Sequence, residues 1–172
     1  MTVTKAPQRI REFEAESVFL AGSIEMGAAE DWQTATAERL VVEGFHVVSP
    51  RRDDWDSTWV QSIADPRFRE QVEWELDYLD SCHRILLYLS PGTKSPISLL
   101  ELGLYAKSDK LIVACPDGFW RKGNVEIVCA RYGVPLYEKL ERAIEGVIAA
   151  RLDALLAPAC GGQKGDPDGG TE

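Results

Sequence analysis

Short apolar runs alternate along the chain with longer segments in which apolar residues recur every three or four positions. The short runs are typical of buried strands and read SVFLAGS (17–23), HVVSP (46–50), RILLYLS (84–90) and KLIVACP (110–116). Helices are predicted at about 28–43 and 67–82, over the segment that holds Glu101, and at about 138–156, the last preceded by a short fifth strand. Strands alternating with helices indicate an α/β fold, a parallel sheet covered on both faces, with its ligand site outside the carboxyl ends of the strands.

The two ends of the chain differ from this pattern. Residues 1–15 are polar and charged, and residues 159–172 are rich in Gly and Asp with almost no apolar side chains. We expect a disordered N-terminal arm at 1–15 and a disordered C-terminal tail at 159–172. The chain of 172 residues, 45% of them hydrophobic, then holds one domain at 16–158.

Charge and composition narrow the classes of partner. A net charge of −9 argues against binding a nucleic-acid polymer or an anionic membrane, and favours a small molecule or another protein. The 4 cysteines are scattered and only 2 histidines are present, so no zinc site of ordinary spacing is predicted, nor any other metal or cofactor. Because the chain has no long apolar run and no signal-peptide pattern, we expect a soluble, cytoplasmic protein with reduced thiols.

A single carboxylate interrupts the apolar segment TKSPISLLELGLY (93–105). An ionised Glu101 buried there without a partner costs several kcal/mol, so it needs either a partner or a function. One reading makes Ser98 the N-cap of the helix and Glu101 part of its capping box. In the other, Ser95 is the N-cap and Pro96 the first helical residue, and Glu101 then lies beyond capping reach, available as a functional carboxylate.

A second acid falls on the apolar face of the preceding helix, EQVEWELDYLDS. The spacing of Val72, Leu76 and Leu79 predicts the buried stripe of this helix, and Glu75 lies within it, whereas Asp77 lies on another face. A carboxylate at the edge of the stripe that pairs with an arginine is the alternative for Glu75. Two carboxylates from consecutive helices at one edge of a sheet suit cleavage of a glycosidic bond, with one as nucleophile and the other transferring protons.

The long segment 50–66 between a predicted strand and helix is dense in charge and tryptophan, and loops of this length are usually functional. Trp55 and Trp59 either stack on a planar base or close over the core, and both alternatives stay open. Arg51 and Arg52 are expected to pair with the aspartates that follow them rather than with a phosphate.

These motifs together resemble the nucleoside 2-deoxyribosyltransferase family, most closely its bacterial branch of 2-deoxyribosyltransferase-like proteins. The resemblance covers roughly residues 16–140 and rests on VFLAGSI (18–24), SPRRDDWD (49–56), VEWELDYLDSC (72–82), SPISLLELGLYA (95–106) and FWRKGNV (119–125). It implies a flavodoxin-like, Rossmann-like three-layer sandwich with a mainly parallel five-stranded sheet. It also implies a homo-oligomer with sites near the subunit interface, a nucleoside or nucleotide and a free nucleobase as small-molecule partners, and no cofactor.

The resemblance also implies roles for particular residues. Glu101 matches the nucleophile that attacks C1′ of a 2′-deoxyribonucleoside and holds the sugar as an ester until another base, or water, takes it. Glu75 aligns best with the acid that assists proton transfer to the base, although a two-residue shift selects Asp77. The substrate contacts expected from the matching motifs are Gly22, Ser23, Ile24, Asp54, Trp55, Ser95 and Asn124.

The chain departs from the family in ways that leave alternatives open. Phe19 stands where the family has a tyrosine that orients the nucleophile, and Ser95 stands where transferases carry an aspartate. Ser23 and Ser95 match serines that contact a 5′-phosphate in related deoxynucleotide N-hydrolases, whereas Asn124 matches the transferases. We therefore expect a deoxyribosyl transferase. Hydrolysis of nucleoside 5′-monophosphates is the first alternative, followed by a catalytically inactive nucleotide sensor and a glycohydrolase of NAD-like nucleotides.

Overall fold

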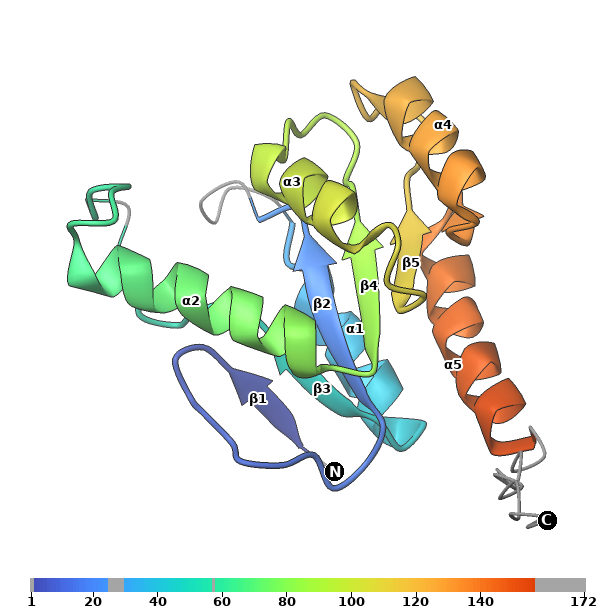
Figure 1. The fold of residues 1–172 in the computed structure, drawn as a ribbon, viewed down its shortest axis with the longest axis horizontal. Helices are drawn as coiled ribbons and strands as arrows, with labels where there is room; N and C mark the ends of the chain where they lie inside the picture. Colours follow the sequence, from blue (N-terminus) through green and yellow to red (C-terminus); the bar gives the residue numbers. More distant parts are fainter. Residues whose placement is uncertain (1, 25–29, 57, 157–172) are drawn as a thin grey trace, which may run out of the picture.

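A parallel sheet lies between two layers of helices in the computed structural model of the chain, which describes residues 2–24, 30–56 and 58–156 (Figure 1). The strands are β1 (Val3–Lys5), β2 (Ser17–Gly22), β3 (His46–Ser49), β4 (Arg84–Tyr88), β5 (Leu111–Ala114) and β6 (Leu136–Tyr137). The helices are α1 (Trp32–Val42), α2 (Pro66–Ser81), α3 (Pro96–Tyr105), α4 (Lys122–Tyr132) and α5 (Leu140–Leu156). Among the described residues, no helix is both long enough and apolar enough to pass through a bilayer.

The order of the strands determines where a ligand can bind. The sheet reads β1-β3-β2-β4-β5-β6, and every neighbouring pair is parallel. From β2 the chain moves outward to β3 on one side, and it then crosses back through α2 to β4 on the other side of β2. Without β1 this is the flavodoxin-like order, in which ligands bind at the carboxyl ends of the two strands where the direction reverses. Here those strands are β2 and β4.

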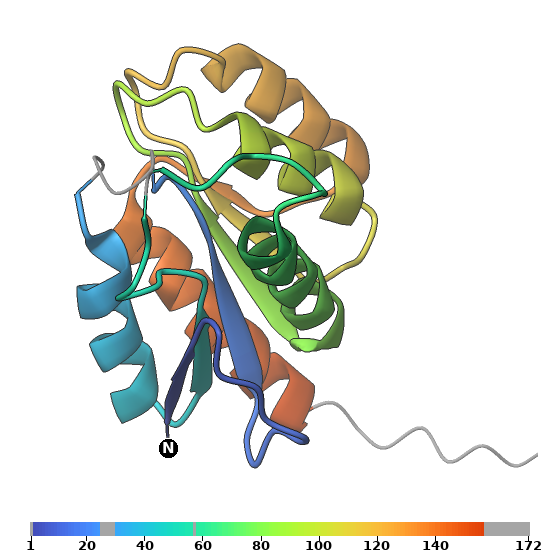
Figure 2. The same cartoon turned by 90° about the vertical axis from the view of Figure 1, so that its left-hand side faces the viewer.

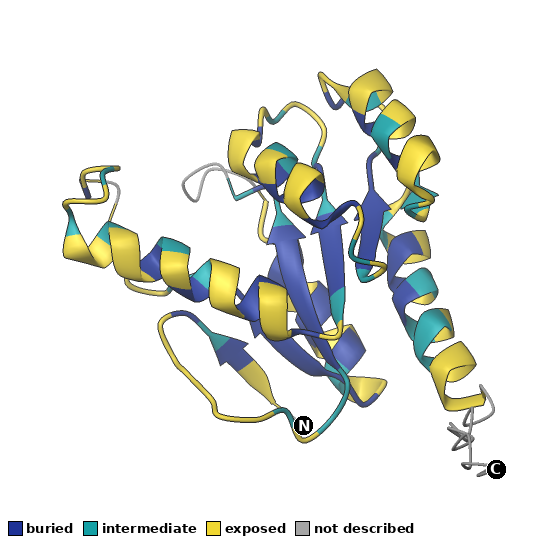
Figure 3. Cartoon of the chain, viewed as in Figure 1, coloured by how far each residue is buried: buried dark blue, intermediate teal, exposed yellow. Residues whose placement is uncertain are grey.

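Each face of the sheet carries its own apolar core. Phe19 and Ala21 of β2 face α2, α3 and α4, whereas Val18 and Leu20 face α1 and α5 (Figure 2). Because the central strands β2, β3, β4 and β5 are covered on both sides, most of their residues are buried (Figure 3), which explains why they read as continuous apolar runs rather than alternating ones.

The described residues form a sheet of six strands, so the expectation of five strands is wrong. The expectation of a disordered N-terminal arm is also wrong for residues 3–5. Residues 3–5 form β1, an edge strand that pairs with β3. Polar contacts fix β1 and the segment after it. The Thr4 hydroxyl lies 2.8 Å from Nε2 of His46, and the indole of Trp74 donates to the Gln8 carbonyl at 2.7 Å. Backbone pairing and side-chain hydrogen bonds thus order a segment that lacks an apolar pattern. The predicted C-terminal tail, 159–172, lies outside the described residues.

Helix α4 was not predicted as a helix, because its apolar pattern is weak. Only Val125 and Cys129 are buried along it. The helix ends at Gly133, whose φ of 70° gives the left-handed C-terminal cap that glycine favours. Helix α4 packs on the same face of the sheet as α2 and α3 (Figure 2).

Candidate functional site

The site begins at the end of β2, where the chain passes very close to β4. Gly22 has a φ of 137°, and a Cβ atom added to it would lie 2.2 Å from the carbonyl oxygen of Tyr88, so this position requires glycine. The next residue, Ser23, donates its N–H to the same carbonyl at 2.9 Å, and its Oγ accepts from the N–H of Ser90 at 2.9 Å. Ile24 follows, half-buried. The loops after β2 and β4 are therefore joined directly at the switch point.

Three hydroxyl groups meet at this junction, and we call them the hydroxyl cluster: Ser23, Thr93 and Ser95. The Ser23 Oγ lies 2.6 Å from that of Ser95 and 2.9 Å from that of Thr93, and the remaining pair is 2.9 Å apart. The cluster stands at the N-terminus of α3, where unpaired N–H groups and the helix dipole favour an anion.

Ser95 is the N-cap of α3 and Pro96 is its first residue, which confirms the second of the two registers and excludes the capping box at Ser98. The φ of 43° and ψ of 56° put Ser95 in the left-handed region, which costs a residue other than glycine of order 1 kcal/mol or more. Its side chain does not cap the helix but joins the hydroxyl cluster. Strained backbone of this kind concentrates at functional sites.

Glu101 lies on the buried face of α3, with 8% of its surface exposed. No hydrogen bond or ion pair connects its carboxylate to another residue in the described part of the chain. Burial, together with the negative charge of Glu75, raises the pKa of Glu101 to about 8. The two glutamates on consecutive helices therefore lie near enough to repel each other.

Glu75 reaches the same region from α2. Its Oε1 accepts a hydrogen bond from Nε2 of Gln71 at 2.8 Å. Burial raises the pKa of Glu75 to about 7, while the bond from Gln71 acts in the opposite direction by favouring the ionised form. Burial therefore raises the pKa of both glutamates far enough that the pair retains a transferable proton near neutral pH.

The inward face of α2 differs from the predicted stripe. Leu76 was expected to be buried, but it is 40% exposed, and the buried face is instead formed by Gln71, Trp74, Tyr78 and Leu79. Glu75 lies on this face because it falls one turn after Gln71 and next to Trp74. Asp77 points outward and pairs with Arg9 at 2.6 Å. The geometry therefore favours Glu75 over Asp77 as the partner of Glu101.

Among the described residues, no hydroxyl group replaces the one that the family's tyrosine would supply at the position of Phe19. Phe19 is fully buried and packs against Trp74, with their rings 6.2 Å apart. Tyr105, one turn after Glu101, donates its hydroxyl to Asp80 at 2.7 Å and is thus held toward α2. Within the described residues, the Glu101 carboxylate interacts electrostatically with Glu75 and with Tyr105, and it accepts no hydrogen bond from the Tyr105 hydroxyl.

The segment 50–56 packs against the start of α2. Arg52 binds Asp54 through both arms of its guanidinium, at 2.8 and 3.0 Å, which confirms the expected pairing for Arg52. In the described part of the chain, Arg51 does not pair with the aspartates that follow it but lies 3.7 Å from Asp31. The guanidinium also lies over the ring of Trp59, 5.0 Å from its centre, and this ring is 5.1 Å from that of Trp55. The Nε1 of Trp55 is buried without a hydrogen-bond partner in the described residues, so one indole donor remains unused.

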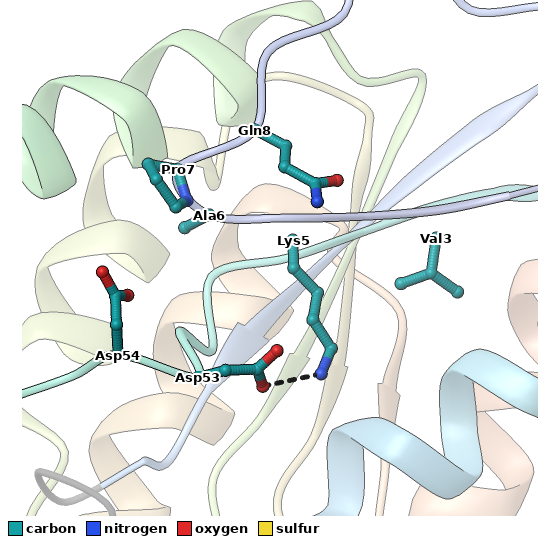
Figure 4. A pocket seen from close by; sticks show the side chains of 7 residues that line it. All are labelled: Val3, Lys5, Ala6, Pro7, Gln8, Asp53 and Asp54. Atoms are coloured by element: carbon teal, nitrogen blue, oxygen red, sulfur yellow. Dashed lines mark hydrogen bonds and ion pairs between the residues drawn. The ribbon is translucent and has the colours of Figure 1, made fainter.

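Asn124 lies in the first turn of α4 with its side chain exposed. Elsewhere, a hollow of about 320 Å³ lies between the N-terminal segment and the 50–56 loop, lined by Val3, Lys5, Ala6, Pro7, Gln8, Asp53 and Asp54. Figure 4 shows Lys5 reaching across it to Asp53, at 2.9 Å. Neither glutamate lines this hollow. The described residues contain no group of three His, Cys, Asp or Glu side chains that could hold a metal ion.

Comparisons with known proteins place this geometry in a family. The family model described as "Nucleoside 2-deoxyribosyltransferase like" matches residues 15–119, which is more than half of the chain. The chain belongs to this family. The matched range contains both glutamates and the hydroxyl cluster.

A search of solved structures gives the same fold. The chain is similar to a conserved protein from Enterococcus faecalis V583, with a TM-score of 0.57 and 11% identity, over 80% of this chain and 99% of that one. At this identity the likeness concerns the fold alone. No curated protein matches the chain.

Proposed function

We propose that this member of the 2-deoxyribosyltransferase-like family cleaves the N-glycosidic bond of 2′-deoxyribonucleosides and transfers the deoxyribosyl group to another nucleobase. The observation that carries the proposal is the pair Glu101 and Glu75: a buried and a half-buried carboxylate on consecutive helices, each with its pKa raised by burial. Structural carboxylates are seldom buried in this way without a cation, whereas carboxylates with raised pKa values are typical of acid–base sites.

Two steps follow from the chemistry of this pair. Glu101 has the higher pKa of the two, so the reactive form, with Glu101 ionised and the proton on Glu75, is the less populated form of the singly protonated pair. From this form Glu101 attacks C1′, the electron pair of the breaking C1′–N bond passes to the base, and Glu75 gives its proton to a base nitrogen. An ester now joins Glu101 to C1′. In the second step, ionised Glu75 takes a proton from the incoming base, whose nitrogen attacks C1′ and releases Glu101. Two inversions retain the configuration at C1′.

The apolar face of α3 contributes to the first step. A buried, unpaired carboxylate is costly in the free protein, and that cost falls when positive charge develops on the sugar ring beside it. The transition state is thereby stabilised more than the ground state, which is the condition for faster turnover.

The hydroxyl cluster favours a second candidate, hydrolysis of nucleoside 5′-monophosphates. Ser23 and Ser95 are buried hydroxyls at the N-terminus of α3, next to the loop that holds Thr93. Hydroxyl donors and helix N–H groups together suit a phosphate. Under this candidate the 5′-phosphate would replace the bonds within the cluster, and water would take the place of the second base.

We also propose that the protein acts in the cytoplasm as a homo-oligomer. Ile97, Leu100 and Leu104 form an apolar row along the outside of α3 and are 60%, 59% and 56% exposed. Their spacing of three and four puts them on one face, which Figure 3 shows as exposed. A row of large apolar side chains on the helix that carries Glu101 suits burial against a second copy of the chain.

Chromatography of the purified protein with 2′-deoxyribonucleosides and their 5′-monophosphates, each with and without a second free base, tests the proposal. A new deoxynucleoside that forms only when the free base is added supports transfer. Base released from the monophosphates alone supports the second candidate. Binding without any reaction would overturn both and favour a sensor. Glu101→Gln should abolish either reaction, while Glu73→Gln, an exposed acid on α2, serves as the control.

A further inference from the structure

Glu75 is held by a residue for which neither the sequence nor the family resemblance suggested a role. Gln71 lies one turn earlier on α2 and is 4% exposed. Its Nε2 donates both to Oε1 of Glu75, at 2.8 Å, and to the carbonyl of Pro50, at 2.9 Å. Its Oε1 accepts from Nη1 of Arg52 at 3.4 Å. Both N–H groups and the oxygen of this buried amide are therefore hydrogen-bonded.

The orientation of the Gln71 amide follows from its partners. An arginine has donors only, so the oxygen of the amide must face Arg52, and a backbone carbonyl has acceptors only, so the NH₂ group must face Pro50. The same NH₂ group then presents its second hydrogen to Glu75. Turning the amide over would put its oxygen against an acceptor and its nitrogen against a donor, which leaves one orientation.

Arg52 is itself fixed from several sides. Its side chain is 5% exposed, binds Asp54 through two parallel hydrogen bonds, reaches Glu70 at 3.3 Å and stacks on Trp59. Because Asp54 and Glu70 offset its positive charge, Arg52 contributes mainly orientation to Gln71. A rigid, bidentate guanidinium supplies this, and the flexible ammonium group of a lysine does not.

We propose that Gln71, oriented by Arg52, is a positioning residue that aims the Glu75 carboxylate for proton transfer to and from the nucleobase. This inference rests on the proposed function and gives the 50–56 loop a role in it. The groups that act on Glu75 are then Glu101 from α3, Gln71 from its own helix, and Arg52 from the loop, through Gln71. Burial opposes the ionised form of Glu75, whereas the hydrogen bond from Gln71 favours it.

The substitution Gln71→Met removes both donors but keeps the length and burial of the side chain. We expect kcat to fall tenfold or more, about the lower end of what acid–base groups contribute. KM should change little, because the amide of Gln71 is already bonded to Pro50, Arg52 and Glu75. The acidic limb of the pH profile should move up by about one pH unit, because a bond to the ionised Glu75 is lost. Arg52→Lys should shift the same limb by less. Arg69→Met, on the exposed side of α2, is the matched control.

A second measurement separates this inference from the proposed function. In ligand-free protein with ¹³C-labelled glutamate carboxyls, the Glu75 signal, assigned with Glu75→Gln, should titrate about one pH unit higher in Gln71→Met than in the wild type. That shift without any turnover in the wild type would overturn the proposed function and leave the Gln71 contact intact. If the wild type turns over substrate, and if kcat, the acidic limb of the pH profile and the titration of Glu75 are all unchanged in Gln71→Met, the positioning role would be overturned.

Discussion

Replacing Glu101 by Gln should make the folded protein more stable in alkaline solution, although it should abolish turnover. The folded protein keeps the Glu101 proton up to a pKa of about 8, whereas the ordinary value is 4.5. Between these values the folded state binds more protons than the unfolded state, so stability falls as the pH rises through this window. Below about pH 4.5 the effect is absent, and above about pH 8 the full penalty applies.

The size of the effect follows from the two values. At 1.36 kcal/mol for each pH unit, a rise from 4.5 to about 8 corresponds to about 5 kcal/mol, as an upper limit, since entry of water and relaxation reduce it. Glu101→Gln removes this charge and also relieves Glu75. In a domain of this size, a gain of that order raises the melting temperature by roughly 10 °C or more. Such a gain is the usual counterpart of a carboxylate kept for function.

Thermal and urea unfolding of the wild type, Glu101→Gln and Glu73→Gln at pH 4.5 and pH 9 measures this effect. The variant at position 101 should match the wild type to within about 1 kcal/mol at the lower pH and exceed it by several kcal/mol at the higher one. Glu73 is exposed and paired with Arg69, so its variant should differ little at either pH. A difference between Glu101→Gln and the wild type that is the same at both pH values would refute the burial of an unpaired charge at this position.

Three further outcomes are expected. The pH profile of kcat/KM for deoxyribosyl transfer should be bell-shaped, rising with an apparent pKa of about 7 and falling with one of about 8, because the singly protonated pair is active. A flat profile from pH 5 to 9 would contradict a role for this pair in catalysis. Gly22→Ala should lower the free energy of unfolding in urea by about 3 kcal/mol or more, because the added Cβ meets the Tyr88 carbonyl. Gly103→Ala, with open space around it, should raise the free energy of unfolding by up to about 1 kcal/mol. Equal effects of the two substitutions would contradict this. Leu100→Asp should yield a smaller species than the wild type in light scattering, and an unchanged mass would exclude α3 from the interface.

The sheet and most of the helices could be predicted because their residues carry strong periodic signals. Strands covered on both faces are continuous apolar runs, and this is why β2, β3, β4 and β5 could be recognised. Strand β1 could not, since its ordering depends on pairing with β3 and on hydrogen bonds such as that between Thr4 and His46, 42 residues apart. An apolar pattern contains no information about such contacts.

The candidate site was predictable to the level of single residues but not of contacts. Glu101 stood out because a charge in an apolar segment violates the pattern around it, whereas the sequence left two registers open for α3 and the structure decided between them. Glu75 was found through a stripe that is partly wrong, since Leu76 is exposed. A glutamine such as Gln71 carries no signal beyond its spacing of four from Glu75, because its importance depends on where the 50–56 loop packs.

The central claim, that Glu101 forms a covalent bond to the sugar, is tested most directly by mass spectrometry of acid-quenched protein after brief mixing with a 2′-deoxyribonucleoside. We expect a mass increase of one deoxyribosyl group on the peptide that contains Glu101. This increase should be lost again when a free base is added before quenching, and it should never be seen in Glu101→Gln. Base release at a normal rate from the Glu101→Gln variant, or a deoxyribosyl group on any other residue, would contradict it.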